Sequence, residues 1–321
     1  MPALALYFLI ERFGHRKRYD TGAASSGPPE LAVPLPARVV LTAVAAVVIA
    51  LVAVLYGTVV VGAFVRLWGI DNAFTLSHFT DAESGALTNE WRGVSTVWQS
   101  LKVALVAAPL GGLLALAVAY IVERIRPVGA NLISFISLLP AVLPGVIFGI
   151  GYIIAFNLPF GVKQLALTGT LGILVLNILF GNLFVGVLAG RASLQRLDSA
   201  VDEAAEILGA SLTQRFWRII LPMMRRAALL GALYVFVDGM TTLSSVVFLV
   251  GPAHKLASVA IFDTASKSYY GAACAMSVTI LVIVFGVMGA LWAFEKHGPA
   301  WMRIDLQAAP RRRVAAAGPG K

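Results

Sequence analysis

Charged residues are scarce in this chain. Only 13% of its 321 residues are Asp, Glu, Lys or Arg, and 59% are hydrophobic, whereas a soluble domain is about a quarter charged. Cys274 is the only cysteine, which excludes an intrachain disulfide and a thiolate metal cluster. The four histidines are scattered along the sequence without the spacing of metal ligands. We therefore expect no metal site, no cofactor and no soluble globular fold.

The sequence also lacks a G-x-x-x-x-G-K-[ST] phosphate-binding loop. We therefore expect that this chain does not bind ATP, so that any nucleotide-driven work would need a separate subunit. No nucleophile–base pair stands out in the apolar stretches, which argues against an enzyme.

What the sequence does contain is long apolar stretches. Each has roughly 20 or more residues, the length of a helix that crosses a hydrocarbon core of about 30 Å. Lipid offers the backbone no hydrogen-bond partners, so each stretch is predicted to be helical. The predicted spans are 39–65, 99–122, 131–156, 168–190, 226–250 and 271–294. The predicted fold is therefore an all-α integral membrane protein with six transmembrane helices.

The distribution of positive charge predicts an orientation. The segments 1–38, 123–130, 191–226 and 295–321 contain 19 of the 25 Lys and Arg residues. Positive loops stay on the cytoplasmic side of a membrane, so we expect these segments, including both termini, in the cytoplasm. The net charge of +9 is then explained by topology in membrane lipid, and we expect no nucleic-acid partner.

The segment 191–222 lies between the fourth and fifth predicted spans and is too polar to cross a membrane. An apolar stripe and an acidic stripe, both at helical spacing, predict an amphipathic helix. The stripes are formed by Leu194, Leu197, Val201 and Leu208, and by Asp198, Asp202 and Glu206. Anionic headgroups would repel the acidic stripe, which favours a protein partner over a lipid surface.

Turn and cap signals divide this segment in two. Ser199 and Asp202 have the spacing of a capping box, and so do Ser211 and Gln214. Gly209 stands where a left-handed residue would end the first helix. Pro222 is predicted to break or redirect the second helix before the fifth span.

The same segment resembles the EAA loop of the permease subunits of ABC importers. That pattern is Glu-Ala-Ala, three residues, Gly, nine residues and Ile-x-Leu-Pro, and every fixed position matches here at the same spacing. The matching positions are Glu203, Ala204, Ala205, Gly209, Ile219, Leu221 and Pro222.

The resemblance implies a permease subunit of the bacterial inner membrane that is not itself an enzyme. In that family the loop docks on cytoplasmic ATPase subunits, and we expect Asp202 to take part with the matching positions. The resemblance covers 95–294, and 39–65 would be an additional N-terminal helix. A periplasmic substrate-binding protein would face the loops at 66–98, 157–167 and 251–270.

Polar and helix-breaking residues within two spans indicate a translocation path. Pro140 and Pro144 interrupt the third span. Asp238 is placed near the middle of the fifth, where a carboxylate indicates function by default. A structural hydrogen bond to Asn177 or Asn182 is the alternative. The remaining candidates are Thr241, Thr242, Ser244 and Ser245.

The stretches 240–252 and 269–277 resemble the C-terminal half of ferric-iron importer permeases, whose relatives transport polyamines, sulfate and phosphonates. Such iron permeases usually fuse two units, and this chain contains one. Its second permease unit would be another copy of itself or a separately encoded first half. A secondary transporter driven by an ion gradient, with Asp238 as the coupling carboxylate, is the alternative from another class.

Overall fold

The computed structural model describes residues 34–297, except 82–84, 87, 89–92, 158–165 and 252. The predicted cytoplasmic segment at 1–38 and the basic tail at 295–321 therefore lie almost entirely outside the described residues. The described residues up to Ile280 form one compact unit, and the second unit begins at Leu281, within the last helix.

Within the described part of the chain, three helices are long and apolar enough to cross a membrane singly. They are α2 (Leu35–Phe64), α4 (Val94–Tyr120), which continues into a π-helical turn η1 (Ile121–Ile125), and α14 (Tyr270–His297). Three pairs of shorter helices meet the same criterion, and each pair is bent at a short break. If each pair is one span, the total is six, in agreement with the predicted all-α membrane fold.

The third predicted span is not one helix. α5 (Ala130–Leu138) and a 3₁₀ turn η2 (Leu139–Ala141) meet α6 (Gly145–Phe156) at 113°. Pro140 lies in the 3₁₀ turn, and Pro144 is the residue before α6. A proline removes one backbone donor and clashes with the preceding turn, so two prolines this close divide the helix.

The fifth predicted span, 226–250, is also wrong in its second half. Helix α12 (Arg225–Thr241) ends at Thr241, and Thr242 is extended. A 3₁₀ turn, η6 (Val246–Phe248), follows. The hydroxyl-rich sequence after Thr241 competes with helical hydrogen bonds, and Ser258 Oγ donates to the Thr242 carbonyl (2.5 Å). Asp238 therefore lies one turn from the end of a helix rather than at its middle.

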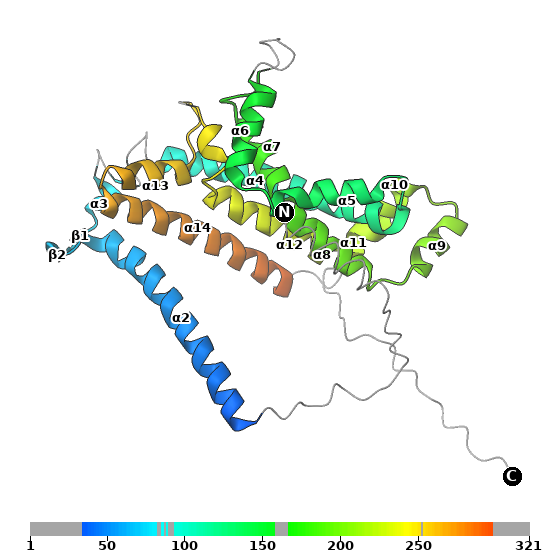
Figure 1. Cartoon of the computed structure of the whole chain (residues 1–321), viewed down its shortest axis with the longest axis horizontal. Helices are drawn as coiled ribbons and strands as arrows, with labels where there is room; N and C mark the ends of the chain where they lie inside the picture. Colours follow the sequence, from blue (N-terminus) through cyan, green and yellow to red (C-terminus); the bar gives the residue numbers. More distant parts are fainter. Residues whose placement is uncertain are drawn as a thin grey trace. The chain divides into compact units, whose positions relative to one another are not determined.

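The remaining pair is α7 (Leu171–Gly181) and α8 (Leu183–Leu194), bent by 41°. Helices α4, α8 and α12 pack side by side (Figure 1). Glycines allow this close contact, because a Cβ on Gly231 would lie 3.0 Å from the Cα of Gly186. Helix contact through small residues is the usual way in which membrane helices associate without a hydrophobic driving force.

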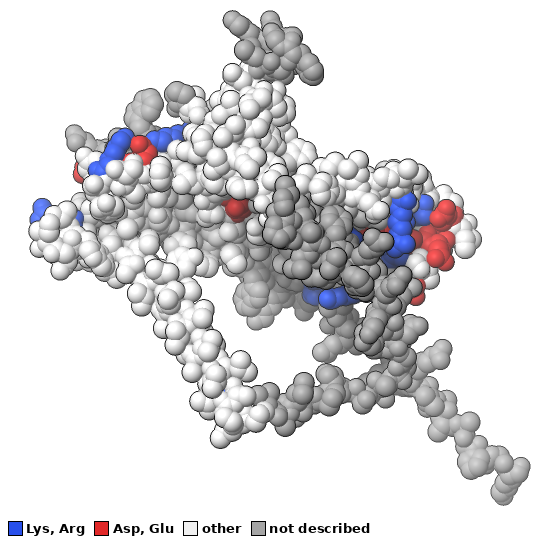
Figure 2. Space-filling model, in the orientation of Figure 1, with Lys and Arg blue, Asp and Glu red and all other residues white. Residues whose placement is uncertain are grey.

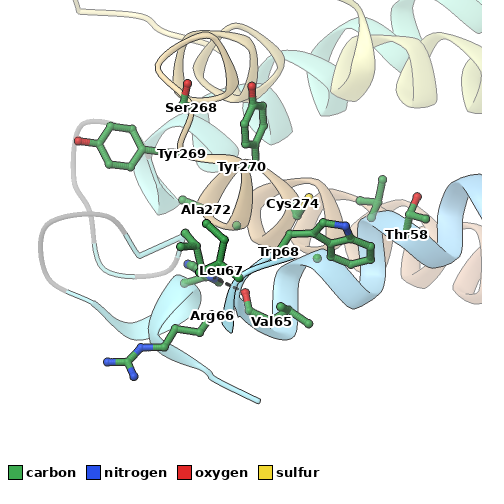
Figure 3. A pocket seen from close by; sticks show the side chains of 15 residues that line it. Thr58, Val65, Arg66, Leu67, Trp68, Ser268, Tyr269, Tyr270, Ala272 and Cys274 are labelled. Carbon is green, nitrogen blue, oxygen red and sulfur yellow. Dashed lines mark hydrogen bonds between the residues drawn. The ribbon is translucent and has the colours of Figure 1, made fainter. Parts of the chain in front are cut away.

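Smaller elements gather where α2 ends and α14 begins. They are the antiparallel strands β1 (Val65–Leu67) and β2 (Asp71–Phe74), α3 (Ser77–Thr80) and α13 (Ala257–Ser266). A cavity of about 560 Å³ here is lined by Trp68, Tyr269 and Tyr270 together with Cys274 (Figure 3). Tyr and Trp are enriched where a membrane meets water, so we expect this group at a membrane boundary.

Replacing Gly112 with alanine tests the close contact between α4 and α12. Its Cβ would lie 2.6 Å from the Ala228 carbonyl oxygen and 2.8 Å from the Ala232 Cβ, so the helices have to separate. We expect a loss of about 1–3 kcal/mol in the free energy of unfolding, measured by thermal unfolding in detergent. Gly57→Ala is the control, since no atom lies within 4 Å of its Cβ. Equal stability of the two variants would contradict the packing described.

Candidate functional site

The predicted turn at Gly209 is confirmed. Helix α9 (Ala200–Ile207) ends there, and Gly209 has a φ of +79°. The amide of Ala210 donates to the carbonyl of Ala205 (3.0 Å), and that of Gly209 donates to Glu206 (2.9 Å). This pair of hydrogen bonds is the glycine-ended helix terminus that satisfies the last carbonyls.

One of the two predicted capping boxes is present. Ser211 Oγ accepts from the Gln214 amide (3.3 Å), and the Gln214 side chain accepts from the Ser211 amide (3.0 Å). They start α10 (Leu212–Arg215), which runs on through η5 (Phe216–Ile220) to α11 (Leu221–Met223). The box predicted at Ser199 is wrong, since Ser199 makes no side-chain cap and Asp198 Oδ1 accepts from the Ala200 amide instead.

The apolar stripe predicted for a single helix is wrong at its end. Helix α8 ends at Leu194, and a separate helix, α9, begins at Ala200. The side chains of α9 therefore point in other directions than they would in one continuous helix. Ile207 and Leu208 are 85% and 86% exposed, side by side before the glycine turn. We call these two residues the apolar tip. The sequence could have indicated this exposed pair, because two large apolar residues stand directly before the glycine that was predicted to end the helix.

The matching Glu-Ala-Ala positions divide between surface and core. Glu203 and Ala204 are exposed beside the apolar tip, whereas Ala205 is buried. Asp202 was expected to face a partner, but it faces inward. Its Oδ1 accepts from the Tyr120 hydroxyl (3.2 Å), and its Oδ2 lies 3.5 Å from Arg124 Nε. Its role is therefore to attach α9 to the end of α4.

A second ion pair lies next to this one. Arg191 Nε donates to Glu123 Oε1 (2.7 Å), and both side chains are largely buried. Arg124 also donates to the carbonyls of Leu194 (3.0 Å) and Leu197 (2.6 Å), which are the carbonyls released where α8 ends. We call Glu123, Arg124, Arg191 and Asp202 the polar joint. The sequence analysis did not identify it, although two charged residues directly after an apolar span were visible.

The end of the matching pattern lies where the chain turns into the membrane. Ile219 and Leu221 are half-buried, and Leu221 packs on a core cluster that includes Ile220 and Met224. Pro222 is exposed, and the helix axis turns by 80° between Met223 and Arg225. The predicted redirection near Pro222 is therefore confirmed. Charged side chains gather around α9 and α10, away from the largely uncharged middle of the surface (Figure 2).

Five of the seven predicted translocation-path residues line one cavity of about 230 Å³. They are Pro140, Asp238, Thr242, Ser244 and Ser245. Pro144 and Thr241 are not among its lining residues, and the Thr241 hydroxyl donates to the carbonyl of Val237 on its own helix (2.9 Å). Residues from α7, η2, α6, α12 and the non-helical stretch after α12 thus meet around one space.

Asparagines on the bent α7–α8 pair complete the cavity. Asn182 Nδ2 donates to Asp238 Oδ2 (2.6 Å), and Asn177 Nδ2 donates to Ser245 Oγ (2.8 Å). The structural hydrogen bond considered for Asp238 is therefore present, with Asn182 as the donor. It does not exclude a functional role, because Asp238 still lines the cavity.

The polar joint gives a stability prediction. Arg124→Ala removes the cation beside the nearly buried Asp202 and the donor for two carbonyls. Removing one partner of a buried ion pair costs about 3–5 kcal/mol. We expect a loss of that size in the free energy of unfolding, measured by thermal unfolding, and faster proteolysis around α9. The control is Arg126→Asn, since exposed Arg126 donates only to a backbone carbonyl and its φ of +48° suits asparagine. Similar losses for both variants would contradict the joint.

Comparison with known families gives a match over residues 107–297 to the family described as "Binding-protein-dependent transport system inner membrane component". The ferric transport system permease protein FbpB of Actinobacillus pleuropneumoniae is 31% identical over 235 residues, which are 73% of this chain and 33% of FbpB. This chain thus spans about a third of the length of that relative.

Two other relatives are similar over most of their own length. The putrescine transport system permease protein PotI of Escherichia coli K12 is 28% identical over 71% of this chain and 87% of PotI. The sulfate transport system permease protein CysT of Synechococcus elongatus is 32% identical over 61% of this chain and 76% of CysT. The family match covers more than half of a chain that has multiple apolar helices. The chain therefore belongs to the multi-pass inner-membrane permeases of binding-protein-dependent transport systems.

Proposed function

We propose that this chain forms the substrate path of an ATP-driven importer and docks on a cytoplasmic ATPase through the helix–glycine–helix segment 199–222. The observation that carries this proposal is the apolar tip. Ile207 and Leu208 are exposed on a projecting turn that carries Glu203 and Glu206 on its surface. Exposed apolar residues rimmed by charge are typical of a protein interface.

The polar joint supports a mechanical role for this segment. Arg124 and Asp202 attach α9 to the end of α4, while Glu206 pairs with Arg215 across the glycine turn (2.9 Å). α4 in turn packs closely against α8 and α12, and α12 carries Asp238. A movement imposed on the tip therefore passes through ion pairs and close helix contacts to the wall of the cavity.

The partners and topology of the complex follow from this arrangement. The tip and both termini face the cytoplasm, which agrees with the positive charge of those segments. A periplasmic binding protein delivers substrate to the opposite side, and a second permease unit completes the path. That unit is another copy of this chain or a separately encoded first half.

Ferric iron is the proposed substrate. The support is the similarity to a permease named for ferric transport. Relatives named for putrescine and for sulfate make a polyamine or an oxyanion, including phosphonate, the alternatives to be tested.

The double substitution Ile207→Asp, Leu208→Asp tests the docking surface. Two desolvated apolar contacts would become charges, so we expect the ATPase subunit of the same gene cluster to co-purify roughly tenfold less or worse. Ile70→Asp is the matched control, because Ile70 is 82% exposed but lies beside β2. Glu203→Ala is expected to weaken co-purification to a lesser degree. Unchanged recovery of the ATPase with the double variant would refute the proposed docking site.

Gly209→Val tests the turn itself. No atom lies within 4 Å of a Cβ at this position, so the effect would come from the φ of +79° alone. A β-branched residue in that conformation costs about 1–2 kcal/mol or more, and we expect loss of ATP-dependent ferric uptake with normal membrane insertion. Gly209→Asn, which tolerates this φ, should retain most of the uptake. Normal uptake by Gly209→Val would contradict the rigid turn, and uptake without any ATPase would favour the ion-driven alternative.

A further inference from the structure

The cavity of about 230 Å³ carries one charge. Asp238 is the charged residue among its lining residues, and none of the described residues that line it is Lys, Arg or His. The other polar side chains around it present oxygen atoms or amides. They belong to Asn177, Asn182, Tyr234, Thr242, Ser244 and Ser245.

Asp238 lies at membrane depth. It follows the first residue of α12, Arg225, by 13 positions, which is about 20 Å along a helix. A carboxylate within a hydrocarbon core of about 30 Å costs several kcal/mol unless it meets water or a partner. Asn182 occupies Oδ2, while Oδ1 accepts no hydrogen bond from the described residues.

A second acceptor in the cavity wall also has no partner. Asn177 is only 2% exposed, and its amide nitrogen is used by Ser245. Its Oδ1 is buried and has no hydrogen-bond partner within the described part of the chain. An unmatched buried acceptor costs about 1–3 kcal/mol, so the wall of this cavity carries a polar group that the described residues leave unsatisfied.

We propose that this cavity is a transit site for a small cation, held by the carboxylate of Asp238 and the neutral oxygens of the residues that line it. This inference depends on the proposed function, since it names the substrate class of the same path. Carboxylate, amide and hydroxyl oxygens are ligands for hard metal ions and equally accept from an alkylammonium group.

The ligand set suits passage rather than storage. Among the described residues no group of three or more His, Cys, Asp or Glu gathers to hold a metal ion, so a cation meets one carboxylate and neutral oxygens. Transport requires binding that is weak enough for release. An oxyanion would be repelled by Asp238, because like charges a few ångströms apart at low dielectric repel by several kcal/mol. The site thus favours cations, such as the ferric ion and the putrescine named for FbpB and PotI, over the sulfate named for CysT.

The charge preference can be measured without transport. Gly181 lines the cavity, and no atom lies within 4 Å of a Cβ there, so Gly181→Cys in a Cys274→Ser background places a thiol in the site. We expect an ammonium-bearing methanethiosulfonate reagent to modify this thiol roughly tenfold or more faster than a sulfonate-bearing one. Adding Asp238→Asn should bring the ratio near one, whereas Thr241→Val should leave it unchanged. Protection by putrescine or by gallium(III) distinguishes an organic cation from a metal ion.

Equal rates with both reagents, no reaction with either, or a preference that survives Asp238→Asn would overturn the cation site. The outcome is independent of the proposed function, which is read from ATPase co-purification and ATP-dependent uptake. If the thiol shows the charge preference but uptake does not depend on ATP, the cation site is supported and the importer function is refuted. If sulfate uptake depends on ATP and the thiol shows no charge preference, the importer function is supported and the cation site is refuted.

Discussion

Two ion pairs withdrawn from water hold the projecting helix–glycine–helix segment to the membrane-spanning helices. Arg124 with Asp202 and Arg191 with Glu123 lie where α4 ends, and their side chains are only 9–15% exposed. Such pairs contribute little net stability compared with apolar packing, but each charge is costly without its partner. They therefore fix geometry. When α9 moves, either α4 moves with it or a buried charge loses its partner. The orientation of the apolar tip follows from this constraint.

The cavity depends on a different constraint, the hydrogen bonding of backbone groups in lipid. The chain leaves helical geometry at Thr242 and between Leu139 and Pro144, and these breaks lie around the same space. Non-helical backbone at membrane depth is tolerated where protein or water satisfies it. Ser258 supplies one such bond to the Thr242 carbonyl. The helix breaks and the polar side chains are thus parts of one feature.

Much of this could be predicted from the sequence because the signals are local. Apolar length predicts the number of candidate spans, although two of them are broken in the structure, and glycine and serine signals correctly predict the turn at Gly209 and the cap at Ser211. Features that depend on contacts between residues far apart in the sequence could not be predicted. Asp202 was placed on an outward acidic stripe, yet Arg124, 78 positions earlier, turns it inward. Leu208 was placed in an apolar stripe that assumes one helix, and the break after Leu194 rotates it to the surface. The proline break of the third span was visible, but its angle of 113° is set by the packing of Gly145 and Gly149 on residues 244–248.

The contacts among α4, α8 and α12 have a mechanical consequence. At Gly112, Gly186 and Gly231 the backbones are so close that a single added carbon would collide with the neighbouring helix. Helices at this separation resist sliding past one another, so we expect the three to move together. We then expect a displacement at one end to be taken up at the nearest non-helical connection, which follows Thr241. That connection belongs to the wall of the polar cavity, so a displacement taken up there would change the shape of the cavity.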